Sequence, residues 1–458
     1  MKCRHCAATL SHQVLDLNHA PPSNAYLTAE QLRAPEVHLP LRLLMCSECF
    51  LVQTEDFAAP DQLFDDEYVY FSSTSRSWLT HATRFCNTAI ERLELSADSL
   101  VVEIASNDGY LLQNFVAAGV PCLGFEPTAS TAAVARSKGV ETRQTFFGKA
   151  EATALRQERG GATLIVGNNV YAHVPDINDF SEGMAALLAP EGVISLEFPH
   201  LCELVAQGQF DTVYHEHFSY LSLTTVQRIL AAAGLRVFDV ERLPTHGGSL
   251  RVWACHDAAT RATAPSVAAV LQQEAVATAP ITGAGAASGE RAGVETGVGQ
   301  PAYFCDLQAQ ADHAADALVE FLQGCRSRGE SVAGYGAAAK GTTLLNYAGV
   351  NQRLLPYIAD AAPFKQGRFL PGAHIPVVSP QVLRDAPPDH LLILPWNLRD
   401  EIAADFADLS KQHGTTLWTV MPHPAPVQPA GSAQKPAGAV TRAELAGPAV
   451  STHHKKAG

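Results

Sequence analysis

The densest group of polar side chains in the sequence is the run Tyr214-His215-Glu216-His217. Because an imidazole titrates near neutral pH, a histidine in this run can serve as a general base. A carboxylate beside it can orient the ring or accept a hydrogen bond from a substrate hydroxyl group. Alternate residues of an extended chain share a face, which would pair His215 with His217, whereas a turn would break that pairing. A His-x-His metal site and a structural role are the alternatives.

A turn between a strand and a helix, at 106–109 (SNDG), has the composition of a ligand site. The preceding segment, 101–105, is typical of a buried strand, and apolar residues then recur at helical spacing up to Gly119. Such a junction is where α/β sheets bind nucleotide-like ligands, but the glycine-rich phosphate motif is absent. Asn107 and Asp108 instead suit a ligand that offers hydroxyl and ammonium groups.

Two more polar positions follow predicted strands. Glu126 ends the strand expected at 122–125, where an acid is placed to accept hydrogen bonds from two ribose hydroxyls. Together with the turn, this acid predicts S-adenosylmethionine (SAM) as the ligand, and an ordinary turn of a doubly wound sheet is the alternative. The segment 168–176 (NNVYAHVPD) follows a later strand. There, Asn168 is placed to accept from the SAM ammonium group, and His173 lies near a second substrate or has a structural role.

Four cysteines have the spacing of a metal site, with Cys3 and Cys6 forming one CxxC pair and Cys46 and Cys49 another. Two such pairs can converge on the tetrahedral sulfur coordination that Zn²⁺ prefers. The loop between them, 7–45, is long, but its closure entropy grows only logarithmically with length. Because no ligand position is left open, the zinc should be structural. Chance CxxC pairs with redox activity are the alternative.

Strands and helices alternate regularly from 101 to 233, which predicts a doubly wound, largely parallel α/β sheet. The expected strands are 101–105, 122–125, 140–147, 162–167 and 193–198. The expected helices are 78–95, 128–138, 149–159, 178–188 and 224–233. Strands 235–241 and 249–255 then flank a Gly-Gly turn, which predicts an antiparallel hairpin. Parallel units that finish in a hairpin fit a class I methyltransferase sheet better than a dehydrogenase.

The composition changes after residue 277. Residues 278–300 are rich in Ala, Gly and Thr, which predicts a flexible linker, and the Pro/Ala/Gly-rich tail 423–458 should be disordered. Between them, 301–422 form a second α/β domain. Its expected elements are helices 301–324 and 342–347, strands 331–335, 357–360 and 390–395, and the turn 336–341. A zinc-binding domain over 1–75 and a SAM domain over 76–277 complete the expected organisation.

The overall composition indicates a soluble, cytoplasmic protein with sizeable cores. Of its 458 residues, 47% are hydrophobic, and the formal charge of −14 argues against a nucleic-acid or membrane partner. No apolar run of about 18 residues and no apolar export segment is present. Ten cysteines are too few for a disulfide scaffold at this length, which suits a reducing compartment.

Several segments, in the same order, resemble those of the nucleotide-sugar C-methyltransferases of deoxysugar biosynthesis. They are the paired CxxC motifs, EIASNDG at 103–109, NNVYAHVPD at 168–176, EFPHL at 197–201, YHEHFSY at 214–220 and GYGAAAKG at 334–341. The resemblance covers roughly residues 1–420, and YHEH combined with the paired CxxC motifs is its most specific part. It implies a zinc-binding N-terminal domain, a SAM domain, and a C-terminal Rossmann-like domain without its own dinucleotide.

The resemblance also implies a reaction, the C-methylation of an NDP-4-keto-6-deoxyhexose, often dTDP-linked, at C3 or in some members C5. His217 would be the base that removes the proton α to the ketone. The residues expected to surround the sugar and steady the enolate are Tyr214, Glu216 and His173, with Tyr68 or, as second choice, Tyr70 reaching in from the N-terminal segment. The residues expected to bind SAM are Glu103, Asn107, Asp108, Gly109, Glu126 and Asn168.

The residues taken alone support the same chemistry, because a ketone acidifies the adjacent C–H bond enough for an imidazole if the enolate oxygen is stabilised. Two other classes of protein stay open. An NAD-dependent sugar oxidoreductase would use 334–336 (GYG), which lacks the third glycine of the fingerprint. A non-catalytic, zinc-dependent interaction protein would leave the Tyr214–His217 run unexplained. We expect a monomer or weak oligomer whose partner is a small-molecule nucleotide sugar.

Overall fold

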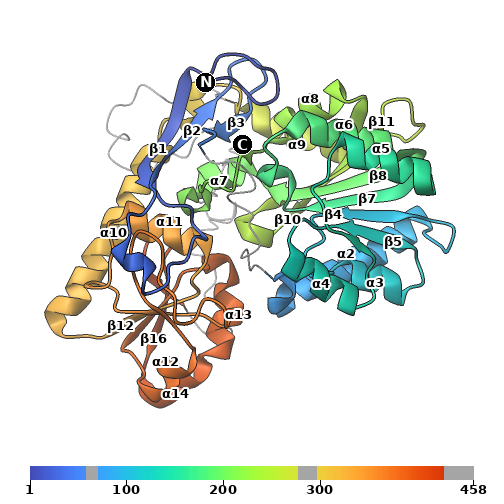
Figure 1. The fold of residues 1–458 in the computed structure, drawn as a ribbon. Helices are drawn as coiled ribbons and strands as arrows, with labels where there is room; N and C mark the ends of the chain where they lie inside the picture. The colour runs from blue at the N-terminus through green and yellow to red at the C-terminus, as the bar shows by residue number, and fades with distance from the viewer. Residues whose placement is uncertain (58–70, 277–296, 428–458) are drawn as a thin grey trace, which may run out of the picture.

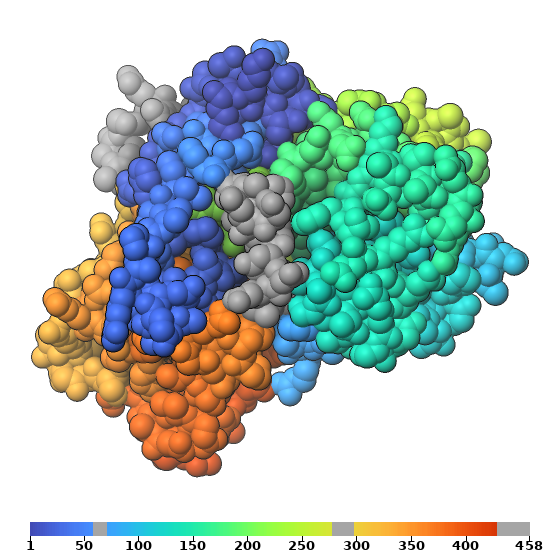
Figure 2. Space-filling view, in the orientation of Figure 1, coloured from blue at the N-terminus to red at the C-terminus, as the bar shows by residue number. Residues whose placement is uncertain are grey.

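A computed structural model describes residues 1–57, 71–276 and 297–427, which form three β-sheets. In Figure 1 the largest sheet lies at the right, the C-terminal sheet at the lower left and the N-terminal strands β1–β3 above the C-terminal sheet. Figure 2 shows the N-terminal residues, in blue, packed against the orange C-terminal residues. Within the described ranges, no helix is both long and apolar enough to cross a membrane.

The largest sheet has its strands in the order β10-β11-β8-β7-β4-β5-β6. They are β4 (Val101–Ile104), β5 (Cys122–Phe125), β6 (Thr142–Arg143), β7 (Ala162–Asn168), β8 (Leu188–Pro199), β10 (Leu235–Leu243) and β11 (Ser249–His256). Neighbours from β6 to β8 pair in parallel, while β11 is antiparallel to both β8 and β10. Parallel units with a terminal hairpin confirm the expected class I methyltransferase sheet.

Helices flank this sheet, with α2, α3 and α4 on one side and α5, α6 and α8 on the other (Figure 1). They are α2 (Arg76–Leu93), α3 (Leu112–Ala117), α4 (Ala129–Ser137), α5 (Lys149–Arg159), α6 (Ile177–Leu187), α7 (Leu201–Gln207), α8 (Leu223–Ala232) and α9 (Pro265–Val276). The strand predicted over 140–147 is wrong in length, because only Thr142 and Arg143 have partners on β5, which ends at Phe125.

A second sheet has the order β1-β2-β3-β9. Its strands are β1 (His12–Ala20), β2 (Leu39–Met45), β3 (Val52–Thr54) and β9 (Ser219–Tyr220). The periodicity does not predict β1, because register shifts between Gln13 and Leu15 and between Asp16 and His19 break its alternation. Since β3 pairs with β9, the cysteine-rich N-terminal segment and the segment after His217 belong to one sheet.

The third sheet has the order β14-β13-β12-β15-β16-β17. Its strands are β12 (Val332–Tyr335), β13 (Ile358–Ala359), β14 (Val377–Val378), β15 (His390–Ile393), β16 (Thr416–Thr419) and β17 (Ala425–Pro426). Its helices are α10 (Leu307–Arg328), α11 (Ala339–Tyr347), α12 (Gln381–Asp385), α13 (Arg399–Asp405) and α14 (Ala407–His413). All strand pairs are parallel except β16 with β17, as in a Rossmann-like domain with one added edge strand.

Three boundaries differ from the expectation. The helix predicted over 301–324 is a short helix, η7 (Pro301–Phe304), followed by α10. The end of the expected linker is packed, because Val298 is buried and its N–H donates to the Glu274 carbonyl (2.9 Å). The expected disordered tail begins too early, since β17 lies beyond residue 422. The linker prediction for 277–296 and the tail prediction for 428–458 fall outside the described residues.

Candidate active site

The run Tyr214–His217 forms a turn directly after the short helix η4 (Phe210–Thr212). The His217 N–H donates to the Tyr214 carbonyl (2.9 Å), so the extended pairing of His215 with His217 does not apply. The Tyr214 and His217 ring centroids lie 3.9 Å apart, and the His173 ring, on η3 (Tyr171–His173), lies 4.5 Å from that of His217. The turn therefore brings three predicted side chains together.

The His217 ring is held in one tautomer. Its Nδ1 lies 2.8 Å from the Thr212 carbonyl oxygen, which only accepts, so Nδ1 carries the proton and Nε2 carries the lone pair. Burial first, and then the neighbouring His173, keep the pKa of His217 well below its usual range. Burial likewise lowers the pKa of His173 to about 4. Both imidazoles are therefore neutral at pH 7.

The other two residues of the run face the N-terminal segment. Glu216 Oε1 accepts from Asn24 Nδ2 (3.2 Å), and His215 Nε2 donates to the Pro40 carbonyl (3.2 Å). Glu216 is only 1% exposed, and this burial raises the pKa of its carboxyl group to about 7. Among the described residues, Oε2 of Glu216 has no hydrogen-bond partner. This oxygen is available to a substrate hydroxyl group.

The predicted SAM turn has an unusual backbone that explains its composition. Ala105, Asn107 and Gly109 have positive φ angles of 56°, 49° and 74°. Glycine and asparagine tolerate this region best, which accounts for two of the three residue types. At the end of β5, the Glu126 carboxylate accepts from the backbone N–H groups of Asn107 (2.9 Å) and Thr128 (2.9 Å), which fixes the acid beside the turn.

Two more predicted acids lie at the same strand ends. Glu103 is buried beneath the turn, and burial first, followed by the charges of Asp108 and Glu126, raises its pKa well above its usual range. Asp108 Oδ2 accepts from Lys138 Nζ (3.1 Å) and from the Ser73 hydroxyl group. Asp108 Oδ1 has no partner within the described residues. One oxygen of this buried acid therefore remains for a ligand.

Asn168, at the end of β7, is the predicted residue that most clearly lacks a partner. It is 8% exposed, and neither its Oδ1 nor its Nδ2 has a hydrogen-bond partner in the described part of the chain. A buried polar group left in this state costs about 1–3 kcal/mol, which a bound ligand would recover. Because β7 and β4 are neighbours at the point where the chain order reverses, the orphaned amide and the turn fit the polar groups of SAM.

The tip of the β10–β11 hairpin adds residues that the sequence analysis did not single out. His246, on η5 (Thr245–Gly247), places Nε2 3.1 Å from Asn169 Nδ2, and its ring lies 5.3 Å from that of Trp78. Burial lowers the pKa of His246 to about 4. The histidine beside the Gly-Gly pair was the available signal, but the hairpin pattern alone assigns it no role.

The turn of the third sheet, 336–341, is occupied by the protein's own groups. Lys365 Nζ donates to the Ala337 carbonyl (2.7 Å), and so does the Tyr26 hydroxyl group. Asp360, at the position where a dinucleotide-binding acid would lie, accepts from the Ala337 N–H (2.7 Å). These contacts do not favour the NAD alternative.

The four predicted metal ligands converge. They are Cys3, Cys6, Cys46 and Cys49, and their sulfur atoms all lie within 4.8 Å of one another. Each pair has the same backbone turn, in which Ala7 and Phe50 have positive φ (60° and 67°) and donate to the carbonyl of the first cysteine (3.0 Å each). Four thiolates in two matched turns fit the tetrahedral coordination of Zn²⁺.

The cysteine-rich segment also contacts the candidate active site. Arg4, between the first two ligands, donates from Nη1 to the Pro175 carbonyl (3.1 Å) and from Nη2 to the Thr54 carbonyl (3.0 Å). Pro175 lies two residues after His173, and Thr54 ends β3, which pairs with β9. The zinc site is therefore linked through short contacts to both histidines of the candidate site.

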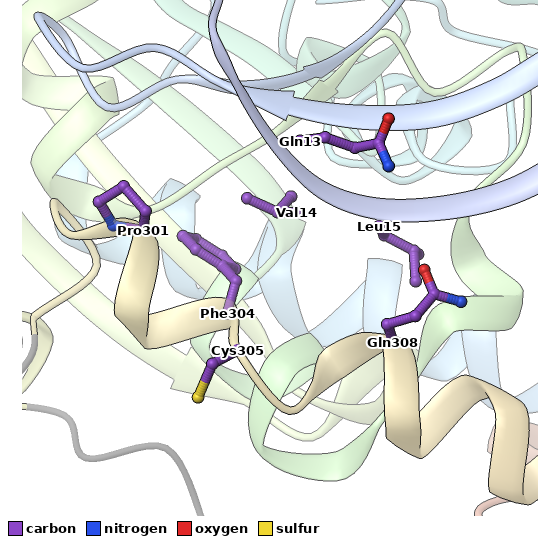
Figure 3. A pocket seen from close by; sticks show the side chains of 7 residues that line it. All are labelled: Gln13, Val14, Leu15, Pro301, Phe304, Cys305 and Gln308. Atoms are coloured by element: carbon purple, nitrogen blue, oxygen red, sulfur yellow. The ribbon is translucent and has the colours of Figure 1, made fainter.

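A cavity of about 250 Å³ lies elsewhere, between β1 and the start of α10 (Figure 3). It is lined by Gln13, Val14, Leu15, Pro301, Phe304, Cys305 and Gln308. Gln308 is already used in the fold, because it accepts from the Asp16 N–H (2.9 Å) and donates to Tyr347 (2.8 Å). None of the predicted site residues lines this cavity. Tyr68 and Tyr70 fall outside the described residues.

Comparisons with known proteins cover each part of the chain. Family models match with the descriptions "Putative zinc binding domain" at 3–64, "Methyltransferase domain" at 78–240 and "C-methyltransferase C-terminal domain" at 288–422. The C-methyltransferase NovU of Streptomyces niveus is 33% identical over 401 residues, which cover 88% of this chain and 91% of that protein.

Two solved methyltransferases align with part of the chain. One, from Anabaena variabilis, is 12% identical, with coverage of 39% of this chain and 85% of that one and a TM-score of 0.32. The other is magnesium protoporphyrin IX methyltransferase from Synechocystis PCC 6803 with bound SAH, at 14% identity, 39% and 83% coverage and a TM-score of 0.32.

The sheet order and the turn after β4 define a class I SAM-dependent methyltransferase that carries an N-terminal zinc-binding domain. The chain belongs to the family of SAM-dependent C-methyltransferases. SAM is therefore its cofactor, and zinc is the metal that the cluster of four cysteines fits. This assignment favours methyl transfer over the oxidoreductase and non-catalytic alternatives.

Proposed function

We infer that the protein methylates an NDP-4-keto-6-deoxyhexose, with dTDP favoured as the nucleotide, at the carbon α to the ketone, with C3 favoured over C5. The identity to NovU supports carbon as the methyl acceptor. The resemblance of YHEHFSY and its companion segments supports the sugar class and a place in deoxysugar biosynthesis. The α carbon of a ketone can accept a methyl group, because loss of its proton gives an enolate, the carbanion equivalent that carbon methylation needs.

The observation that carries this proposal is the fixed tautomer of His217. With Nδ1 donating to the Thr212 carbonyl, Nε2 is the basic atom, and the low pKa keeps it unprotonated at pH 7. The aromatic rings of Tyr214 and His173 pack against the His217 ring and restrict its rotation. A base with one orientation and one protonation state suits proton removal from carbon.

In the proposed reaction, His217 Nε2 takes the proton from the α carbon, and the electron pair of that C–H bond forms the enolate. When bound, SAM would supply the electrophilic methyl group to the enolate carbon and would leave as S-adenosylhomocysteine. Glu216 and Tyr214 would bind hydroxyl groups of the sugar, and His173 would hold the His217 ring in place. The proton on His217 then leaves to solvent.

Replacement of His217 by Asn tests the base. The variant should lose at least about 100-fold in both methyl transfer and solvent deuterium exchange at the α carbon, since general bases contribute about 10²–10⁴-fold. SAM affinity should stay unchanged. The matched control is His313→Asn, an exposed histidine on α10, which should behave as wild type.

The substrate is tested by incubating the protein with SAM and a panel of dTDP- and other NDP-4-keto-6-deoxyhexoses. The products are then analysed by mass spectrometry. A mass gain of one methyl group on a carbon of the sugar is expected. Methyl transfer to oxygen or nitrogen only, or unchanged rates of both reactions in His217→Asn, would contradict the proposal.

A further inference from the structure

The third sheet turns the carboxyl ends of its central strands toward the hairpin tip beside the candidate active site. In open α/β sheets, ligands bind beyond the strand ends where the strand order reverses, which here is between β12 and β15. Lys340, in the first turn of α11, and Trp396 and Asn397, on η8 (Trp396–Leu398), lie at that edge. Next to η8 is η5, the hairpin tip of the methyltransferase sheet, where a Cβ on Gly247 would lie 2.4 Å from Trp396.

The close contacts of Lys340 are with uncharged groups, although the Asp211 carboxylate also acts on its charge. Its Nζ donates to Asn397 Oδ1 (3.1 Å) and lies 4.4 Å from the centroid of the Trp396 ring. Among the described residues it forms no salt bridge, whereas Lys365, on the same domain, lies 3.6 Å from Asp360. An ammonium group has three N–H donors, so at least one of them remains for an incoming anion.

Helix α11 is fixed against the segment that carries the base. The Thr343 hydroxyl group donates to the Val213 carbonyl (3.0 Å), one residue before Tyr214. Asp211, on η4, accepts from Trp396 Nε1 (2.6 Å) and thereby orients the ring under Lys340. The positive charge of Lys340 is close enough to add to burial in lowering the pKa of both His217 and His246.

We propose that Lys340 is a catalytic residue whose ammonium group binds the ketone oxygen and stabilises the enolate that His217 generates. The inference rests on the proposed function. The C–H bond breaks, its proton goes to His217 Nε2, and its electron pair moves into the new C=C bond as the carbonyl π pair moves onto oxygen beside Lys340. A cation placed in advance at the developing negative charge is the usual source of such stabilisation. The third domain then completes the active site rather than only covering it.

The test separates enolisation from binding. Deuterium exchange at the α carbon of dTDP-4-keto-6-deoxyglucose is followed with S-adenosylhomocysteine present, and the dissociation constant of dTDP alone is measured by calorimetry. Lys340→Met should lower the exchange rate at least 100-fold and change dTDP affinity less than about threefold, since one oxyanion donor is worth about 10²–10³. Lys340→Arg should recover part of the exchange.

The control is Lys411→Met, an exposed lysine on α14, which should match wild type. If Lys340→Met loses as much dTDP affinity as exchange rate, then Lys340 binds the diphosphate of the substrate, and the proposal is overturned. Wild-type exchange in Lys340→Met also overturns it. Should Lys340→Met fail to bind SAM, Lys340→Gln replaces it. An absence of exchange and of methyl transfer in the wild type with every sugar nucleotide would instead reject the proposed function, and this inference with it.

Discussion

The Thr54 hydroxyl group donates a hydrogen bond to the carbonyl of His217 (3.1 Å), and the Thr54 N–H donates to the next carbonyl, that of Phe218 (3.2 Å). Thr54 ends β3, a strand that begins three residues after the zinc ligand Cys49. The backbone of the candidate base is therefore anchored to the zinc-binding domain. A structural metal in this domain can therefore affect the position of His217 through these hydrogen bonds.

Loss of zinc should accordingly slow methyl transfer. Cys46→Ser removes one ligand of a buried site, and we expect less than one zinc per chain together with at least a tenfold loss of kcat, because β3 no longer holds the turn at His217. Metal content by atomic absorption and methyl transfer are measured on the same samples. The exposed Cys305→Ser should keep both. Full activity in zinc-free protein would contradict this reading.

The architecture of the methyltransferase sheet is predictable because its strands are short, buried and separated by helices with clear periodicity. Val101–Ile104 and Ala162–Asn168 are nearly continuous apolar runs, as expected for parallel strands covered on both faces. The N-terminal strands are not predictable in the same way, because the irregular register of β1 hides its period and β9 has only two residues.

The residues of the candidate site likewise differ in how well the sequence predicts them. Local patterns single out most of the candidate residues: Asn168 and Glu126 each follow a predicted strand, the four cysteines have a regular spacing, and His217 belongs to the densest run of polar side chains. Lys340 and His246 reach the site only through packing between domains and the hairpin tip, which no local pattern encodes. The segment GYGAAAKG does signal a strand–turn–helix, but not that the charge of its lysine acts on His217 and His246, which lie outside the C-terminal domain.

Glu126 should contribute to SAM affinity. Both carboxylate oxygens are engaged by backbone N–H groups, so in Glu126→Gln the amide N–H₂ group would oppose one of these donors and distort the turn at Asn107. We expect the SAM dissociation constant to rise at least tenfold, measured by calorimetry. The control is Glu141→Gln. Glu141 is exposed and pairs with Arg159, so its replacement should leave SAM affinity unchanged. Equal affinity in the two variants would remove Glu126 from the SAM site.

Glu197 should be the strongest polar contributor to the stability of the methyltransferase domain. It is fully buried on β8 and accepts from Arg251 (2.6 Å), His81 (2.8 Å) and Thr245 (2.9 Å). Burial alone would raise the pKa of Glu197, but these partners hold that pKa below its usual value. The stabilisation is therefore present above the carboxyl pKa of the unfolded chain and is lost as the pH falls through the folded pKa.

Glu197→Gln should lower the free energy of unfolding by about 3–5 kcal/mol near neutral pH, because it takes from the buried Arg251 the closer (2.6 Å) of its two carboxylate partners, the other being Glu241 at 3.5 Å. Urea unfolding at pH 7 and at progressively lower pH measures this, and the gap between wild type and variant should narrow toward acid. Glu182→Gln breaks an exposed pair with Lys149 and should cost less than about 1 kcal/mol. A pH-independent gap would show that packing rather than charge is responsible.

The pH dependence of kcat/KM should have an alkaline limb set by Lys340. Burial lowers the pKa of Lys340 to about 8, and Asp211 acts in the opposite direction. The other titratable groups that face it are His217 and His246, both neutral throughout this range. Because the ammonium form is the one that stabilises an enolate, kcat/KM should fall as the pH rises through about 8.

The Lys340→Arg variant tests this assignment, because a guanidinium stays protonated throughout the pH range of the measurement. Its residual activity should show no limb near pH 8, while Lys411→Arg should keep the wild-type profile. The His217 base adds no acid limb above pH 6.5, since its pKa is depressed, and its neutral form is the active one. An unchanged alkaline limb in Lys340→Arg would place that titration on another group and leave Lys340 without a role in the pH profile.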